Sequence, residues 1–301
     1  MSDFSYYFGC RKLTLNIPES LLIEDDISNR FRHGLLPVDA ESIISVQAMS
    51  EAEALTHLPQ LSEPVYQDEK FEIYRDADRE LRFYHMEDES ARVTYAYSIC
   101  SDNKIQLVLY KNSNYLQAHP HFPFLHHIHI EQQLLQSQAM ILHSCFMEYH
   151  GKGILFTAPS GTGKTTQGKL WERIYQASII NGDRCLIQKY KDRFYGCGYF
   201  NHGSAPECEN RIIPLDAIVI VRQSPSDQIV ELSLQEKIQW IYSETTVNKW
   251  NSDAISATLD LIIELVTQVR VIRLNCTMND SAAHVLHHYL YKEKLWNYSQ
   301  A

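Results

Sequence analysis

The stretch Gly153-Ile-Leu-Phe-Thr-Ala-Pro-Ser-Gly-Thr-Gly-Lys-Thr-Thr166 decides the fold class of this 301-residue chain. Its first five residues form an apolar run typical of a buried strand, and the residues from Lys164 to about Tyr175 predict a helix. A loop rich in Gly, Ser and Thr lies between them. A strand, a glycine-rich loop and a helix in this order are typical of a phosphate-binding loop.

The composition of this loop suits the binding of a nucleotide. Glycines at 161 and 163 allow successive backbone N–H groups to point at phosphate oxygens, and the helix N-terminus adds its positive end. Lys164 can reach the β- and γ-phosphates, and the Thr165 hydroxyl can ligate Mg²⁺. Ala158 stands where the usual pattern has its first glycine, but the tight turns fall on the later glycines. The expected nucleotide-binding residues are Ser160, Gly161, Thr162, Gly163, Lys164, Thr165 and Thr166.

A second acid-bearing segment follows about twenty residues later. Residues 179–184, Ile-Ile-Asn-Gly-Asp-Arg, read as an apolar strand that ends at Asp183. A carboxylate at the end of a strand near a phosphate-binding loop can hold Mg²⁺ directly or through water. The Asn-Gly pair also favours a tight turn. The two interpretations are compatible, since the turn would place the acid, and we expect Thr165 and Asp183 to be the metal ligands.

The rest of the chain reads as two domains, residues 1–120 and 121–301. The first contains short alternating segments separated by polar turns, which predict an antiparallel sheet, and a partial helix is expected over 39–56. In the second, apolar strands alternate with helical runs, the clearer of which is 252–268. This alternation predicts an α/β fold, a central sheet flanked by helices.

Charge and cysteine content limit the function. There are 27 Lys and Arg against 37 Asp and Glu, a net charge of −10, and this acidic balance argues against broad binding to nucleic acid or to an anionic membrane. The seven cysteines are scattered and include no C-x-x-C pair, which fits reduced thiols in the cytoplasm. No apolar run is long enough to span a bilayer, and no signal peptide is expected.

The motifs resemble those of a known superfamily. The order Leu142-His143-Ser144, Gly153-Ile-Leu, Ser160-Gly-Thr-Gly-Lys-Thr165 and Asp183-Arg184 is similar to that of the HPr kinase/phosphorylase and phosphoenolpyruvate carboxykinase superfamily. The resemblance covers about residues 140–222. It implies an α/β fold with a P-loop core like that of HPr kinase and carboxykinase, preceded here by an N-terminal β-rich (α+β) domain.

The resemblance also implies site residues and one departure. His143 matches the family's histidine near the phosphates, and Asp183 matches the second acid of the kinase Asp-Asp-Arg motif. Gly182 stands where the kinases have their first Asp, the base for the attacking serine, so Asp183, His143 or another group would be the base. Arg211 and Arg222 are candidates for neutralising charge on the transferred phosphoryl group, although a solvated surface arginine is the simpler alternative.

The function expected from these features is that of an ATP-dependent phosphotransferase. The γ-phosphoryl group of Mg²⁺-bound ATP would pass to a hydroxyl, most simply serine, of a peptide or small protein. Its catalytic residues would be His143, Asp183, Lys164 and Arg211. Two alternatives remain open: an ATP-binding regulatory or recognition protein without transfer, and a small-molecule phosphotransferase or carboxykinase-like enzyme. The hexamers of the superfamily suggest a homo-oligomer, but no motif requires one.

A group of histidines near the domain boundary first suggests a zinc site. His119, His121, His126, His127 and His129 lie close together in sequence. Their spacing fits no standard zinc pattern, and surface histidines are the better interpretation. The eighteen tyrosines fall mostly in strand-like segments, where an amphipathic ring suits a half-buried face.

Overall fold

The computed structural model describes residues 2–18, 26–58, 60–76, 78–88, 91–111, 128–203 and 206–292. The chain divides into two compact units, Met1–Ser137 and Gln138–Ala301. The domain boundary expected at residue 120 lies outside the described residues. Helix α4 (Ile130–Gln136) belongs to the first unit, because Gln133 and Ser137 accept hydrogen bonds from the buried guanidinium of Arg11.

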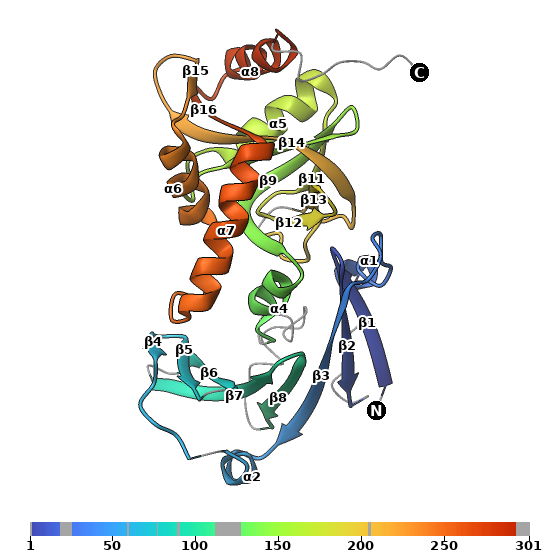
Figure 1. Ribbon diagram of the computed structural model, residues 1–301, viewed down its shortest axis with the longest axis vertical. Coiled ribbons are helices and arrows are strands. Elements are labelled where there is room, and N and C mark those ends of the chain that lie inside the picture. The colour runs from blue at the N-terminus through green and yellow to red at the C-terminus, as the bar shows by residue number, and fades with distance from the viewer. Residues whose placement is uncertain are drawn as a thin grey trace. The chain divides into compact units, whose positions relative to one another are not determined.

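The N-terminal unit is built on one eight-stranded sheet with the order β1-β2-β3-β8-β7-β6-β5-β4 (Figure 1). The sheet is mixed: β3 runs parallel to both β2 and β8, so the expectation of a purely antiparallel sheet was wrong for these pairs. The elements are β1 (Ser2–Phe8), β2 (Arg11–Ile17), α1 (Asp26–Arg30), β3 (Ala40–Met49), α2 (Glu51–Thr56), β4 (Tyr66–Gln67), β5 (Phe71–Arg75), β6 (Glu80–Asp88), β7 (Ala91–Ser101), β8 (Lys104–Tyr110) and α4.

The helix expected over 39–56 is mostly a strand. Within β3, Ser42, Ile44 and Val46 are buried at every second position, which is the period of a strand with one covered face. Only the end of the segment is helical. Helix α2 begins after Ser50, whose side chain forms a capping box with Glu53.

A buried polar network occupies the N-terminal unit where α4 begins. Arg82 forms ion pairs with Glu80 at 2.6 Å and with Glu131 at 2.8 Å. His129 joins Glu80 through Nδ1 and Ser98 through Nε2, and its side chain is fully buried. The interpretation of His129 as a surface residue was therefore wrong, because a hydrogen-bonded network satisfies the buried ring.

The remaining histidines of the suspected zinc group lie outside the described residues. These are His119, His121, His126 and His127. Among the residues that are described, no three His, Cys, Asp or Glu side chains are grouped so that they could hold a metal ion.

The C-terminal unit combines a second large sheet with helices. Its pairings β10–β9, β9–β12, β12–β13, β13–β14 and β14–β10 form a closed circuit, and β16 and β15 extend the sheet from β14. The elements are β9 (Ala139–Tyr149), β10 (Lys152–Thr157), α5 (Lys164–Tyr175), β11 (Ser178–Asn181), β12 (Arg184–Tyr190), β13 (Arg193–Cys197), β14 (Ile212–Gln223), β15 (Gln228–Glu231), α6 (Leu234–Glu244), α7 (Ser252–Gln268), β16 (Arg270–Cys276) and α8 (Asp280–Lys292).

The core of this unit explains why its sequence alternates between strands and helices. Strands β10, β14 and β16 run parallel and contribute alternate apolar residues to a cluster with α5 and α8, including the fully buried Trp171. Helices α6 and α7 pack together and contact β9, β13 and β16. The α/β character expected from the sequence is confirmed, as a mixed fold with two large sheets.

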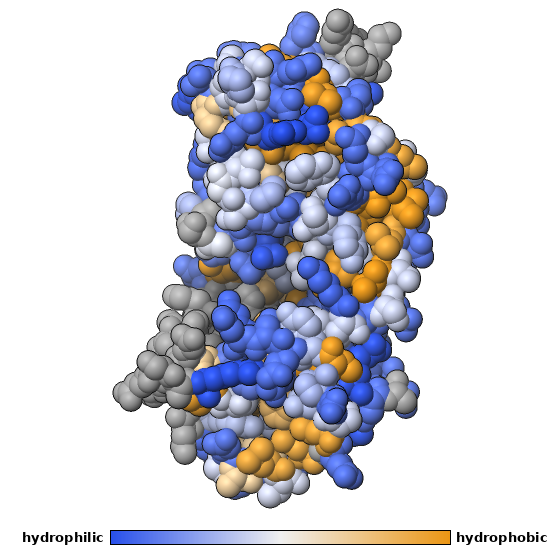
Figure 2. All heavy atoms as spheres, turned by 90° about the vertical axis from the view of Figure 1, so that its left-hand side faces the viewer, coloured by the Kyte–Doolittle hydropathy of each residue, from blue (hydrophilic) through white to orange (hydrophobic). Residues whose placement is uncertain are grey.

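The surface and the cysteines add little that is unusual. Figure 2 shows hydrophobic residues gathered in patches within a mostly hydrophilic face. All seven cysteines are buried and free. Among the described residues, no helix is both long enough and apolar enough to cross a bilayer.

Candidate functional site

The glycine-rich loop lies at the C-terminal end of β10, between that strand and the first turn of α5. Gly161 and Gly163 have φ angles of +76° and +111°, a region that favours glycine. A Cβ atom on Gly163 would also come within 2.5 Å of the Cε atom of Met278. Ala158 is fully buried in the core cluster, so its methyl group is accommodated where the usual pattern has glycine.

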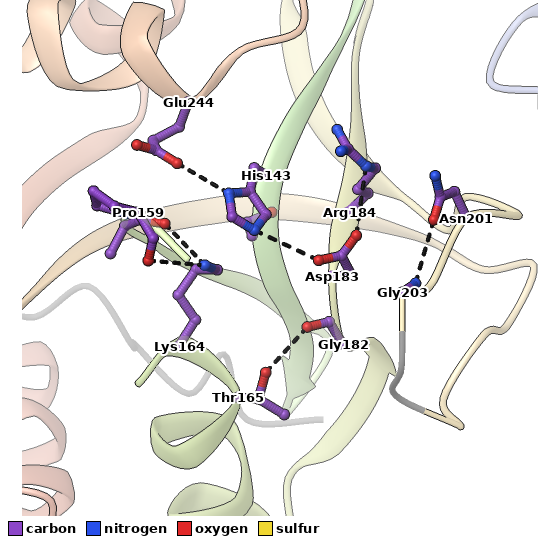
Figure 3. Close-up of polar contacts among 12 residues, drawn as sticks. His143, Pro159, Lys164, Thr165, Gly182, Asp183, Arg184, Asn201, Gly203 and Glu244 are labelled. Carbon is purple, nitrogen blue, oxygen red and sulfur yellow. Dashed lines mark hydrogen bonds and ion pairs between the residues drawn. The ribbon is translucent and has the colours of Figure 1, made fainter. Parts of the chain in front are cut away.

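Lys164 begins α5 and folds back over the loop (Figure 3). Its ammonium group donates to the carbonyl of Ala158 at 2.9 Å and is 3.4 Å from that of Pro159. Burial lowers the pKa of Lys164, because the charged form has lost water. An anionic ligand in the loop would restore the lost solvation of this charge.

Thr165 occupies the next position of the helix and faces the segment that carries Asp183. Its hydroxyl donates to the carbonyl of Gly182 at 3.2 Å. A hydroxyl has one hydrogen and two lone pairs, so this bond leaves the Thr165 oxygen able to ligate a cation.

Asp183 is positioned by Asn181. The side-chain oxygen of Asn181 accepts the backbone N–H groups of Asp183 at 2.9 Å and of Arg184 at 2.8 Å, which fixes the turn between β11 and β12. Both of these strands pair with β9. Contact with His143, and then the charge of Arg184, lowers the pKa of Asp183 below its ordinary value of 3.8.

His143 lies on β9 between two carboxylates. Its Nδ1 is 3.0 Å from Oε2 of Glu244, and its Nε2 is 3.5 Å from Oδ1 of Asp183. Glu244 was missed in the sequence, because it is 101 residues from His143 and belongs to no motif. One signal was present: Glu244 ends helix α6, where a carboxylate opposes the helix dipole.

These groups surround one cavity of about 440 Å³. The described residues that line it are His143, Ser160, Gly161, Gly163, Lys164, Thr165, Thr166, Lys169, Gly182, Asp183, His202, Pro206 and Glu207. The backbone N–H groups of the loop and the ammonium group of Lys164 suit phosphate oxygens, and the oxygens of Thr165 and Asp183 suit Mg²⁺. The residues present therefore fit a magnesium-bound nucleotide.

The structure brings together most of the expected site residues, but not all of them. Thr162 does not line the cavity; its carbonyl accepts a bond from Gln223 instead. Arg211 is ion-paired with Glu148 at 2.8 Å, and Glu148 pairs with Gly153 at the end of β10 opposite the loop. The placement of Arg211 beside the phosphates was therefore wrong. Arg222 is exposed near the loop edge of β14 and does not line the cavity either.

Comparison with known proteins places the chain in a family. No curated protein matches it in sequence. Among solved structures, the HPr(Ser) kinase/phosphatase from Coxiella burnetii matches with a TM-score of 0.31 and 8% sequence identity, over 51% of this chain and 98% of that one. A likeness at this level supports no assignment of activity. Residues 122–281, just over half of the chain, match the family described as SynChlorMet cassette protein ScmC. The chain belongs to the ScmC family.

Proposed function

We propose that this protein is a Mg²⁺- and ATP-dependent phosphotransferase that acts on a hydroxyl, most simply serine, of a peptide or small protein. One observation carries the proposal: the glycine-rich loop with Lys164 faces the pair His143 and Asp183 across a single cavity. Phosphate binding and proton transfer would then take place within the same cavity.

Each residue has a role that follows from its chemistry. The loop N–H groups and Lys164 hold the β- and γ-phosphates, and the hydroxyl of Thr165 and the carboxylate of Asp183 hold Mg²⁺. The metal ion, when bound, offsets the negative charge of the phosphates. Because Lys164 is largely buried, its attraction to phosphate is weakly screened by solvent.

The transfer exchanges one bond for another. The oxygen of the acceptor hydroxyl bonds to the γ-phosphorus, and the bond between that phosphorus and the β–γ bridging oxygen breaks. ADP leaves with the bonding electrons, and the hydroxyl proton passes to a base in the cavity. Gly182 provides no carboxylate, so the base would come from another lining residue. His143 and Asp183 are the candidates that face Lys164; His202 and Glu207 also line the cavity, and Glu207 is paired with Lys169.

Properties outside the cavity complete the proposal. The N-terminal unit would recognise the peptide or protein acceptor, and the protein would work in the cytoplasm, where its seven free cysteines stay reduced. Its net charge of −10 makes nucleic acid and anionic membranes poor partners. A homo-oligomer fits this proposal without being required by it.

A second candidate is favoured by Gly182. If the missing carboxylate has no substitute, the protein binds ATP as a regulatory or recognition module and transfers nothing. The two candidates differ in one measurable property, the formation of ADP when an acceptor is present.

The test is a calorimetric titration of Mg²⁺-ATP into the wild type, Lys164→Ala and Lys189→Ala. Lys189 is the matched control, because its ammonium pairs with Glu264 away from the cavity. We expect the wild type and the control to bind, and Lys164→Ala to bind at least about 100-fold more weakly, the loss of a charge-assisted contact. No binding by the wild type would contradict the proposal.

A second step separates transfer from binding. ADP formation is measured with a pool of serine-containing peptides, and phosphopeptides are sought by mass spectrometry. Phosphoserine in any peptide supports the kinase. Tight ATP binding without ADP or phosphopeptide for the whole pool would favour the recognition module.

A further inference from the structure

We propose that Glu244 is a positioning residue that holds the imidazole of His143 with Nδ1 protonated and Nε2 directed into the cavity. The role of this pair in the reaction rests on the proposed function, whereas the orientation of the ring does not depend on it. The proposal assigns a role to Glu244, which belongs to no motif. It also makes the oriented imidazole of His143 the substitute for the carboxylate that is missing at Gly182.

The backbone around Glu244 is fastened to the strand that carries His143. Leu142 and Thr245 form an isolated antiparallel bridge, and the N–H of Thr246 donates to the carbonyl of Ile141 at 2.9 Å. The residues next to Glu244 are therefore hydrogen-bonded to the residues next to His143. The two side chains meet because the end of α6 is docked on β9, which is a stronger constraint than a surface contact between two mobile side chains.

The hydrogen-bond chemistry fixes the state of the ring. A carboxylate can only accept, so the 3.0 Å contact with Glu244 requires Nδ1 of His143 to donate. The other nitrogen is 3.5 Å from Oδ1 of Asp183, at the long end of hydrogen-bond distances. In the neutral ring that we propose, the single N–H lies on Nδ1 and Nε2 carries the lone pair. His143 lines the cavity, and this lone pair is available there.

Burial distinguishes the two members of the pair. The side chain of Glu244 is 10% exposed and does not line the cavity, whereas that of His143 is 21% exposed and does. The carboxylate thus acts from behind the ring and cannot be the group that meets a substrate directly. Glu244 also lies at the C-terminal end of α6, where the helix dipole destabilises a negative charge. Contact with an N–H donor such as Nδ1 of His143 offsets this effect.

The charges that face His143 come from three further elements. Glu244 ends α6, Asp183 and Arg184 lie where β12 begins, and Lys164 opens α5 (Figure 3). In the proposed transfer, Asp183 is engaged as a ligand of the metal. Nε2 of His143 would then accept the proton of the acceptor hydroxyl, and Glu244 keeps the ring oriented.

The first test reads the ring directly and needs no nucleotide. The protein is labelled with ¹⁵N-histidine and its spectrum recorded in alkaline buffer, where imidazoles are neutral; His143→Gln identifies the signal. We expect the Nδ1–H tautomer in the wild type and its loss in Glu244→Met, which removes the acceptor with little change in size. An Nε2–H tautomer of His143 in the wild type would overturn the proposal, whether or not Glu244→Met folds.

The second test asks whether this orientation matters for the reaction. The rate of Mg²⁺-ATP hydrolysis, with water as the acceptor, is compared in the wild type, Glu244→Met and Glu264→Met. Glu264 is the matched control, since its carboxylate pairs with Lys189 on another surface. We expect Glu244→Met to lower kcat about 10–100-fold, as is usual for residues that orient a functional group, with KM for ATP changed less than about 3-fold.

The outcomes separate the two proposals. If the wild type does not bind Mg²⁺-ATP but shows the expected tautomer, the proposed function fails and the placement of Glu244 stands. If Mg²⁺-ATP binds and His143 keeps its Nδ1–H tautomer in Glu244→Met, the role of Glu244 is refuted. If Glu244→Met loses the Nδ1–H tautomer but keeps its kcat, the link between the orientation of His143 and the rate of the reaction is refuted.

Discussion

The two units of this protein contain nearly the same local arrangement, with opposite consequences. In the N-terminal unit, Nδ1 of His129 is 3.1 Å from a carboxylate oxygen of Glu80, and Nε2 is 2.7 Å from the hydroxyl of Ser98. In the C-terminal unit, Nδ1 of His143 is 3.0 Å from Glu244. The second nitrogen of His129 is thus used by a neighbour, while that of His143 faces a cavity.

The comparison shows that a carboxylate–imidazole pair is not by itself a functional site. The first pair is buried and continues into the ion pairs of Arg82, so its contacts serve the structure. The second pair leaves one lone pair open beside a phosphate-binding loop. Access to the second nitrogen is what separates a stabilising histidine from a chemically usable one.

The sharpest way to test this difference is to remove each ring. His129→Ala removes the hydrogen bonds of the ring to Glu80 and Ser98 inside the core and opens a cavity, so we expect the free energy of unfolding to fall by about 3 kcal/mol. His143→Ala should cost about 1 kcal/mol, because that ring is partly exposed. Urea denaturation measures both.

The activities of the same variants should run in the opposite order. His129→Ala, where folded, should bind Mg²⁺-ATP and hydrolyse it as the wild type does, while His143→Ala should lose hydrolysis. Equal stability losses in the two variants would mean that burial does not distinguish the two pairs.

A smaller effect is expected at Gly203, which packs against Asp183. Its φ is +61°, and a Cβ atom there would lie 2.9 Å from Cγ of Asp183. Gly203→Ala should cost about 1 kcal/mol of stability from backbone strain and should also displace the carboxylate, which weakens the binding of Mg²⁺-ATP. Calorimetry with and without Mg²⁺ measures the second effect.

Gly151 provides the matched control for this substitution. It has a φ of +72°, and nothing lies within 4 Å of the position of its Cβ. Gly151→Ala should therefore show a similar loss of stability and unchanged binding. Equal binding in both alanine variants would show that contact with Gly203 does not hold Asp183 in place.

The smallest effect concerns pH. Burial, and then the charge of Arg82, lowers the pKa of His129 below its ordinary value of 6.5. The unfolded chain therefore takes up a proton at this position that the folded chain does not, and the free energy of unfolding rises with pH through that range. His129→Gln should flatten this rise in urea denaturation between pH 5 and about 7.5. An unchanged slope would mean that folding does not lower the pKa of His129.

The sequence was informative where local chemistry decides the structure. The helices 164–175 and 252–268 were predicted with their observed bounds, because a glycine-rich loop precedes one and a strong apolar period marks the other. Strand β3 was mistaken for a helix, since its register depends on pairing with β2 and β8. Strand β15 was not expected, because a four-residue segment has too little pattern of its own.

The same reasoning applies to the site. Lys164, Thr165 and Asp183 could be placed together from motifs, because α5 and β11 follow the loop directly and the turn at Asn181 sets the position of Asp183. Glu244 could not, because a bridge between Leu142 and Thr245 brings it to His143, and nothing in either local sequence encodes that bridge. Arg211 was misplaced because residue type and loop position alone were used to predict its place. They do not determine at which end of a strand the residue lies.

The bridge between Leu142 and Thr245 also has a consequence for the order in which the site is assembled. During synthesis the chain emerges from its N-terminus, and folding units form in that order. Strand β10, which carries the loop, pairs with both β9 and β14, and Gln167 on α5 donates to the carbonyl of Thr277. The loop is therefore held by segments that emerge both before and after Glu244, and the loop and the oriented imidazole would be completed together, once the whole unit has emerged.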